Sequence, residues 1–481
     1  MATSGISRTV AKAEAKPEEE NPSGIRTLAV FLCILMPSLC MWIYLFPGFL
    51  QPDHATTIAL LATGKLDAWH SVFWALLAKP LLYDLPSYGF YGLAQVLLYA
   101  VSITFSIIKL SQLDVIKAVG TRVLTAVFAL SPCYLLYNVT YLSDMVFAIL
   151  LVPYTAMLVE LAVTNLESFK RTSFLVGLST LTFVLLELRK NALLIPLILF
   201  IVLLIMRKDL WKRILVGVLV PVVAFFGINS VFDAVFDVRK SPSQEMMSVP
   251  AQQIGRVYAA NLPVPEDLNG YFTSIRSADE WKRQYHEDEA DTEKQGLKLS
   301  AQFVGNWVRL GIKYPTVYAA AHWGLMKNYF MVGSKPTVSL DFSAFPDFTT
   351  VACKERCKPE YVQQMTAPLN QRQEKVLQWF AAMSGPKWLT LTVRRVFFDT
   401  ATPFWCLLAV FLVTMLRKKR KRLLIAVIPL ACLFIAFLCF SPIVLTRYAM
   451  EMYYMIPVLM AAAVGRGEIS DSVSDSESRL H

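Results

Sequence analysis

Ten apolar runs constrain what this 481-residue chain can fold into more than any other feature. A helix needs roughly 20 apolar residues to cross the hydrocarbon core of a bilayer. Charged residues make up 17% of the chain, against about 25% in soluble globular proteins. A soluble enzyme and a disordered chain are therefore excluded. The runs are residues 27–46, 88–108, 119–135, 144–164, 173–187, 191–206, 214–232, 401–416, 423–441 and 444–464.

The basic residues indicate how these runs are oriented. With the N-terminus inside, 21 of the 46 Lys and Arg residues lie in predicted cytoplasmic segments or at the span ends beside them. Because cytoplasmic loops are enriched in Lys and Arg, we expect both termini to be cytoplasmic. The net charge of +10 then reflects topology and indicates no nucleic-acid partner. The short outer segments hold only Lys65, Lys79, Arg189, Lys190 and Arg447.

The sequence predicts an all-α polytopic membrane protein. About ten transmembrane helices are expected, with a mostly helical extracytoplasmic domain inserted before the last three spans. That domain has 20 basic and 17 acidic residues and is long enough to fold as a unit. The expected parts are a disordered cytoplasmic tail (1–25), a transmembrane core (26–232) with a first outer loop (47–87), the extracytoplasmic domain (233–395), C-terminal spans (396–465) and an acidic cytoplasmic tail (466–481).

Within 233–395, one amphipathic helix is predicted, and Pro315 should kink or end it. Its apolar face is indicated by residues spaced by three or four. These are Phe303, Trp307, Leu310, Tyr314 and Tyr318.

Cys353 and Cys357 lie in the sequence Cys-Lys-Glu-Arg-Cys of the same segment. A zinc site needs about four ligands, and no second pair or nearby His is visible. Outside the cell a local disulfide is the better interpretation, and free or mispaired thiols are the alternative.

Two acidic residues near the outer ends of spans are candidates for chemistry. Asp53 lies just beyond the first span, either as one polar residue of a solvated loop or as a general base for glycosyl transfer. Asp144 opens the fourth span, where the helix dipole and Ser143 stabilise a carboxylate whether or not it belongs to a site. His54 and His70 form no recognisable metal set with Asp53, so metal use stays open.

Three cations lie on the outer face, where the topology rule does not require them. Arg189 and Lys190 follow Glu187 between the fifth and sixth spans. Either they form a salt bridge with that acid or snorkel to lipid phosphate, or they clamp a substrate phosphate. Arg447 opens the last span and either pairs with Glu451 one helical turn later or supplies a second phosphate contact.

These features together resemble the glycosyltransferase-C superfamily of polytopic membrane enzymes, and within it an uncharacterised bacterial family. The resemblance covers most of the chain. Its most specific part is Ser248-Val249-Pro250-Ala251-Gln252-Gln253-Ile254. The other matching stretches are short: Pro47-Gly48 with Asp53 and Asp67-Ala68-Trp69-His70, the Asp144 segment, Arg189-Lys190-Asn191, Trp307 to Tyr318, and Arg447-Tyr448.

The resemblance implies a plasma-membrane enzyme that moves a sugar from a polyprenyl-phosphate-linked donor to an extracytoplasmic cell-envelope acceptor, a glycan or a protein. Asp53 would be the general base of an inverting displacement. Arg189, Lys190 and Arg447 would bind the donor phosphate. Membrane lipid is an expected partner, and no cofactor beyond the lipid-linked donor is certain. Supporting roles fall to His54, His70, Asp144, Glu245, Gln252, Gln253 and Arg256.

The alternative function is a transporter or flippase of lipid-linked glycans. It explains the spans and the outer cations, but it does not require an acid at a fixed place in the first outer loop. Transporters often show inverted repeats and broken helices, and no such pairing is visible. The enzyme interpretation predicts that Asp53, Arg189 and Arg447 meet in one place at the outer face.

Overall fold

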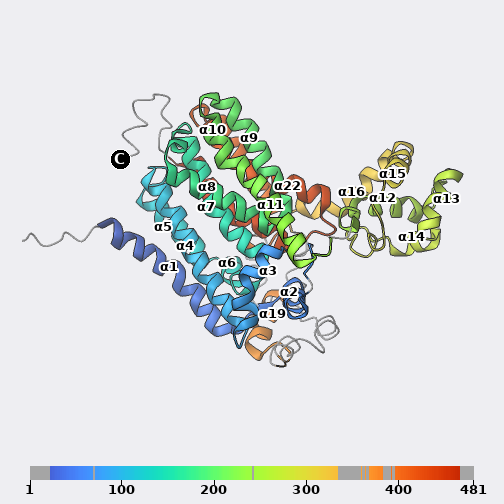
Figure 1. Ribbon diagram of the computed structural model, residues 1–481, viewed down its shortest axis with the longest axis horizontal. Helices are drawn as coiled ribbons and strands as arrows, with labels where there is room; N and C mark the ends of the chain where they lie inside the picture. Colours follow the sequence, from blue (N-terminus) through green and yellow to red (C-terminus); the bar gives the residue numbers. More distant parts are fainter. Residues whose placement is uncertain are drawn as a thin grey trace, which may run out of the picture.

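The computed structural model describes residues 22–333, 368–382 and 396–465, apart from 65, 69–70 and 241–242, together with residues 359, 363 and 392. This part of the chain is almost entirely helical, and its only strands are two residues long each (Figure 1). The all-α fold class predicted from the sequence is therefore confirmed. Helix α1 begins at Pro22, so residues 22–25 of the predicted tail are helical.

Each of the ten predicted apolar runs coincides with one helix or with successive helices. Within the described residues, five stretches are long and apolar enough to cross a membrane: Gly24–Leu45, Gly89–Gln112, Ser143–Val163, Lys208–Phe236 and Lys421–Phe440. The bundle helices are α1 (Pro22–Leu45), α4 (Gly89–Gln112), α5 (Ala118–Leu130), α6 (Pro132–Tyr137), α7 (Ser143–Val163), α8 (Thr172–Leu188), α9 (Leu194–Met206), α10 (Trp211–Ile214), α11 (Val220–Phe236), α21 (Thr402–Leu416), α22 (Leu424–Phe440) and α23 (Thr446–Val464).

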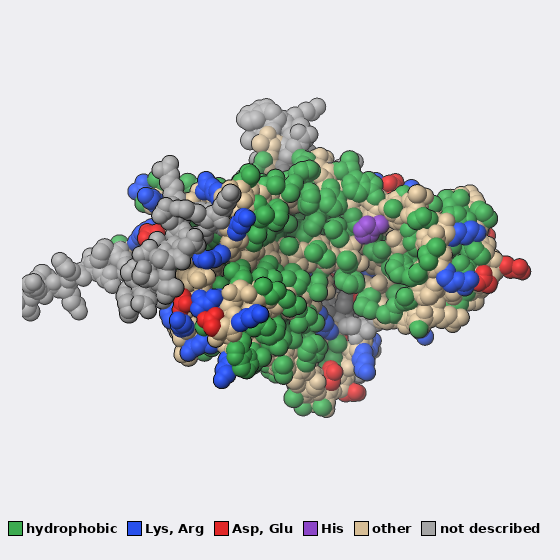
Figure 2. Space-filling model, turned by 90° about the horizontal axis from the view of Figure 1, so that it is seen from above, with side chains coloured by type: hydrophobic (Ala, Val, Ile, Leu, Met, Phe, Trp, Pro, Cys, Tyr) green, Lys and Arg blue, Asp and Glu red, His purple; other side chains and the backbone are tan. Residues whose placement is uncertain are grey.

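Helix α7 is the centre of this bundle. Nearly all of its side chains are buried, as expected for a helix that is apolar on every side. Helices α4, α8, α22 and α23 pack around it. The outer helices instead leave large apolar side chains exposed, such as Ile205 (72% exposed) and Val223 (67%). Figure 2 shows this apolar surface across the middle of the molecule, which suits contact with lipid.

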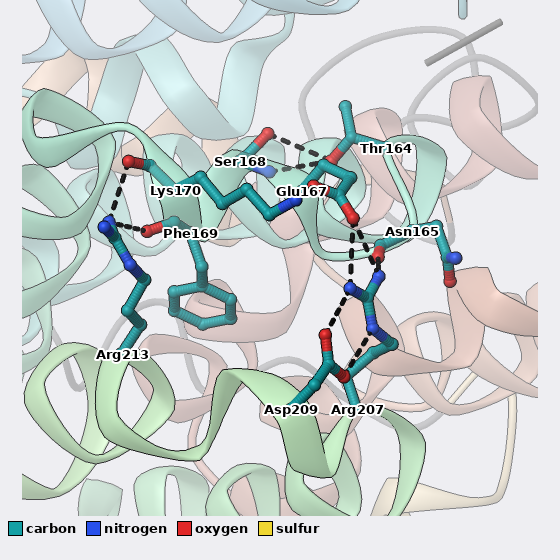
Figure 3. A network of polar contacts seen from close by, with 9 residues as sticks. All are labelled: Thr164, Asn165, Glu167, Ser168, Phe169, Lys170, Arg207, Asp209 and Arg213. Carbon is teal, nitrogen blue, oxygen red and sulfur yellow. Dashed lines mark hydrogen bonds and ion pairs between the residues drawn. The ribbon is translucent and has the colours of Figure 1, made fainter. Parts of the chain in front are cut away.

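Lys and Arg side chains gather at the end of the bundle where α1 and α5 begin and α9 ends, which we call the basic end. Figure 3 shows a polar network there that joins the loop after α7 to the loop after α9. Both Nη atoms of Arg207 lie 3.0 Å from Glu167 Oε1, and Nη2 also donates to Asp209 Oδ2 at 2.6 Å. Arg213 donates to the backbone oxygens of Phe169 and Lys170. The two loops are thereby held together.

Short helices at the opposite end of the bundle form a projecting domain, defined here as residues 243–329 (Figure 1). The domain has an apolar core of its own, centred on the buried Trp281, Phe272 and Ile254. Its elements are η6 (Ser243–Met246), α12 (Ser248–Ala259), α13 (Glu266–Ile275), α14 (Ala278–Gln284), α15 (Ala301–Lys313), α16 (Pro315–Met326) and η7 (Lys327–Tyr329).

The predicted amphipathic helix of this domain is present, and Pro315 ends it. Helix α15 stops at Lys313, and α16 begins with Pro315 at its first position, where a missing N–H costs nothing. Phe303 and Leu310 are buried in the domain core. The predicted disulfide between residues 353 and 357 lies outside the described residues.

Glu293 is a buried acid of the projecting domain, with 1% of its surface exposed. Its Oε1 accepts a hydrogen bond from the backbone N–H of His286 at 2.5 Å. Burial raises the pKa of Glu293 to about 8, and the neighbouring Arg276 only partly offsets the effect.

We expect this domain to lose stability as the pH rises from about 5 to 8.5. The unfolded chain releases the Glu293 proton near pH 4.5, whereas the folded domain holds it up to about pH 8. The folded state binds more protons in this interval, so its free energy of unfolding falls by a few kcal/mol in order of magnitude. Glu293→Gln should flatten this dependence in urea-dependent proteolysis at pH 5.5 and 8.5. Asp279→Asn, an exposed acid on α14, should retain it; a Glu293→Gln protein that also retained it would contradict the expectation.

Candidate functional site

A parallel strand pair brings the first outer loop against the start of α7. Strand β1 (Phe49–Leu50) pairs with β2 (Thr140–Tyr141). Directly after β1, helix α2 (Pro52–Thr63) begins and carries Asp53 in its first turn. Helix α7 begins soon after β2 and carries Asp144 in its first turn. The pairing therefore places the beginnings of α2 and α7 side by side.

The turn that leads into β1 is fixed by close packing. Gly48 has a φ of +92°, and a Cβ there would lie 2.2 Å from the hydroxyl of Tyr141. That hydroxyl donates to the backbone oxygen of Pro47 at 2.6 Å. Gln373, on α19 (Gln371–Ala382), donates to the backbone oxygen of Gly48 at 2.7 Å. A glycine is required here, and the side chains of Tyr141 and Gln373 fix the turn that precedes Asp53.

Two arginines form three ion pairs at this end of the bundle. Arg447, in the first turn of α23, has its Nη1 2.9 Å from Oδ2 of Asp53. Arg189, the residue after α8, has its Nη2 2.5 Å from Oδ2 of Asp144 and its Nε 2.9 Å from Oε1 of Glu451. The structure thus brings Asp53, Arg189 and Arg447 together, where the sequence only placed them on one face.

The ring of Tyr448 contacts both arginines. The guanidinium carbon of Arg189 lies 5.5 Å from the ring centroid, and that of Arg447 lies 5.0 Å from it. Cation–π contacts of this kind are favourable within about 6 Å. We call the whole group the outer charge cluster: Asp53, Asp144, Arg189, Arg447, Tyr448 and Glu451.

Burial divides the charged residues of the cluster into an inner group of three and an outer pair, Asp53 with Arg447. The side chain of Glu451 is fully buried, and those of Arg189 and Asp144 are 13% and 12% exposed. The side chain of Asp53 is 36% exposed, so it is the acid that an incoming hydroxyl reaches most easily. Two carboxylates balance Arg189, whereas Arg447 is paired with Asp53. Arg447 is therefore the cation better placed to exchange its carboxylate for another anion.

Neither of the simple local pairs considered from the sequence is formed. Glu187 accepts hydrogen bonds from Asn229 of α11, at 3.1 and 3.3 Å, instead of pairing with Arg189. Glu451 pairs with Arg189 instead of Arg447. Both arginines thus bind acids that lie far away in the sequence.

Lys190 does not join the cluster through any contact that the structure describes. Its Nζ donates to the backbone oxygen of Ala68 at 2.5 Å. Asp67, beside Ala68, in turn pairs with Arg239 at 3.7 Å. Lys190 therefore anchors the first outer loop to the turn before α9, and Asp67 joins the same loop to the segment after α11.

The profile of a family of unknown function, DUF6020, matches residues 87–475. The chain belongs to this family. No curated protein and no solved structure matches the chain. The matched part includes Asp144, Arg189, Arg447 and Glu451, whereas Asp53 precedes it.

Gln252, in the DUF6020 part of the chain, connects the projecting domain to the cluster indirectly. Its amide donates to the backbone oxygens of His286 and Glu287, at 2.6 and 2.9 Å. The next residues pair with the loop before α23, where the Ala290 N–H donates to the backbone oxygen of Pro442 at 2.8 Å. Pro442 lies five residues before Arg447, so this chain of contacts helps to fix the start of α23.

The other three supporting residues of the domain are also placed away from Asp53. They bind inside the projecting domain and hold its helices together. The Gln253 amide contacts Trp307 and Tyr318, Arg256 donates to the hydroxyl of Tyr285, and Glu245 pairs with Lys294 at 2.7 Å.

His54 follows Asp53 in the first turn of α2, and His70 lies outside the described residues. Among the described residues, no group of three or more His, Cys, Asp or Glu side chains is arranged to hold a metal ion.

Tyr448 and Glu451 were missed as site residues from the sequence. An ionisable residue within an apolar span is a functional candidate by default, and this signal applies to Glu451. Tyr448 carries no comparable signal, because a tyrosine near the end of a span is common at membrane interfaces.

Proposed function

We propose that the protein is an integral membrane glycosyltransferase that moves a sugar from a polyprenyl-phosphate-linked donor to a cell-envelope acceptor at the outer charge cluster. One observation carries the proposal: the half-exposed carboxylate of Asp53 lies 2.9 Å from the guanidinium of Arg447. A carboxylate takes a proton from a hydroxyl, and a guanidinium binds a phosphate. The two groups that an inverting sugar transfer needs are therefore adjacent.

In the proposed reaction, an acceptor hydroxyl attacks the anomeric carbon of the donor while Asp53 takes its proton. A carbon–oxygen bond forms to the acceptor, and the bond from the anomeric carbon to the phosphate oxygen breaks. The electron pair of that bond leaves with the polyprenyl phosphate. Once protonated, Asp53 is neutral and no longer balances Arg447, whose guanidinium can then stabilise the leaving phosphate.

Arg189 is a positioning residue in this proposal. Asp144 and Glu451 occupy two of its nitrogens, and its face lies against Tyr448. It holds the ring that Arg447 also contacts, and it neutralises two buried acids. Helices α2, α7 and α23 all begin at the cluster, and the positive ends of their dipoles add to the attraction for a phosphate.

The location of the reaction follows from the proposed topology. Ten crossings with both termini in the cytoplasm put the basic end inside and the outer charge cluster at the extracytoplasmic face. A polyprenyl chain can then lie against the apolar outer surface of the bundle while its phosphate reaches Arg447. The plasma membrane and the multi-pass arrangement are parts of this proposal.

Arg447→Gln tests the phosphate contact. We expect it to lower sugar transfer from a polyprenyl-phosphate donor about 100-fold or more, because it removes a charged donor aimed at the leaving group. Arg239→Gln is the matched control, since it removes one positive charge from the same end of the bundle at a side chain that is 81% exposed. It should change the rate little. Transfer that is retained in Arg447→Gln, or lost to the same extent in Arg239→Gln, would overturn the assignment.

A further inference from the structure

A groove at the basic end, away from the outer charge cluster, runs between α1 and α5. Its volume is about 620 Å³, within the range of roughly 300–1,000 Å³ seen for small-molecule sites. Small and apolar side chains line most of it, including Ala29, Val30 and Cys33 on α1 and Ala126 and Ala129 on α5. Such a surface suits a hydrocarbon chain.

Two arginines line the same groove. Arg26 lies in the second turn of α1, and Arg122 lies in the second turn of α5. One nitrogen of Arg26, Nη2, donates to the hydroxyls of Ser111 and Thr121 at 2.8 Å each, which fixes its guanidinium. Among the described residues, Arg122 has no hydrogen bond or ion pair, although its charge stands beside an apolar groove. Its exposed guanidinium is therefore free to bind a phosphate at the mouth of the groove.

The apolar part of the groove spans most of one leaflet of a membrane. From Arg122 to Leu130 its lining on α5 is about 12 Å long at 1.5 Å per residue. Half of a hydrocarbon core of about 30 Å is about 15 Å. The arginines are near the helix starts, so they stand at headgroup level when the apolar lining stands at acyl-chain level.

We propose that this groove binds one anionic phospholipid of the leaflet at the basic end. Its phosphate lies between Arg26 and Arg122, and one acyl chain follows α5 toward Leu130. The apolar lining excludes a soluble anion as the sole ligand, and the two guanidiniums favour a headgroup with net negative charge over a zwitterionic one. The proposal concerns a different site from the outer charge cluster and does not depend on the proposed function.

Native mass spectrometry of the purified protein, with added phosphatidylglycerol or phosphatidylcholine of the same chain length, tests the proposal. The wild-type protein should retain one phosphatidylglycerol in preference to phosphatidylcholine. Arg26→Gln/Arg122→Gln should weaken that binding at least about tenfold, because hydrogen bonds to charged groups are lost. Ala126→Trp should block the acyl chain and weaken the binding of both lipids at this site. Ala126 is exposed, so the larger side chain need not disturb the fold.

Lys208→Gln/Lys212→Gln is the matched control, because it removes two positive charges from the basic end outside the groove. It should bind phosphatidylglycerol as the wild-type protein does. Three results would overturn the proposal: equal retention of both lipids by the wild-type protein, unchanged binding in both groove variants, or a thermal shift with inorganic phosphate as large as that with phosphatidylglycerol.

Discussion

Asp53→Asn should lower sugar transfer by about 10²–10⁴-fold, the usual contribution of a general base. Asparagine has nearly the shape of aspartate and can still accept a hydrogen bond from Arg447, but it cannot take the acceptor proton. Because the Asp53 side chain is 36% exposed, we expect the variant to fold and to insert in the membrane as the wild-type protein does. The measurement is the transfer of labelled sugar from a set of polyprenyl-phosphate sugars by the protein in lipid nanodiscs.

Asp84→Asn is a suitable control for this experiment. Asp84 is an exposed acid of the same first outer loop, at the end of the π-helical turn η1 (Pro80–Asp84) that follows α3 (Val72–Lys79). It should transfer sugar at the wild-type rate. An Asp53→Asn protein that did the same would exclude Asp53 as the base.

Arg189→Met should reduce the free energy of unfolding by about 3–5 kcal/mol, which is the largest effect on stability that we expect. The substitution leaves Asp144 and Glu451 as buried carboxylates without their shared counter-charge. It also removes one of the two guanidiniums packed on Tyr448. The midpoint of unfolding in detergent, followed over a denaturant series, measures this loss.

Arg239→Met is the matched control for Arg189→Met. Arg239 pairs with Asp67 at the same end of the bundle, but its side chain is 81% exposed. The atoms of this pair are 3.7 Å apart and its cation lies in solvent, although Asp67 is buried, so its loss should cost at most about 1 kcal/mol. Replacing Glu451 by Met together with Arg189 should recover part of the stability, since one unpaired buried charge is then absent. Equal midpoints for the wild-type protein and Arg189→Met would show that the ion pairs of Arg189 with Asp144 and Glu451 are not needed for stability.

The sequence predicted the helices well because their signals are local. Apolar length alone located the bundle helices, and the spacing of Phe303, Leu310 and their neighbours located α15. Pro315 ended that helix as expected, because a proline fits the first turn of a helix and not its interior. Each of these features depends on residues within a few turns of one another.

Which residues pair with one another at the site depends on packing between distant helices, and no local sequence pattern predicts that packing. Arg189 was correctly singled out from its position, but its partners, Asp144 and Glu451, come from helices distant in the sequence. Lys190, its direct neighbour, points to Ala68 because the chain turns at the end of α8. The resemblance implied supporting roles for Gln252 and Gln253, whereas in the structure their amides bind backbone oxygens within the projecting domain. Arg189 and Lys190 are adjacent in the sequence but bind different parts of the structure, whereas the partners of Arg189 come from distant helices. Tertiary contacts alone determine both outcomes.

Mass spectrometry of envelope glycans is the most direct test of the proposed sugar transfer. The comparison needs a strain that lacks the gene and the same strain complemented with the wild-type protein or with Asp53→Asn at equal membrane abundance. We expect one sugar to be missing from a glycan or glycoprotein of the deletion strain, to return with the wild-type protein, and to remain missing with Asp53→Asn. Identical glycans in all strains, or full restoration by Asp53→Asn, would contradict the proposal that this protein transfers a sugar with Asp53 as its base.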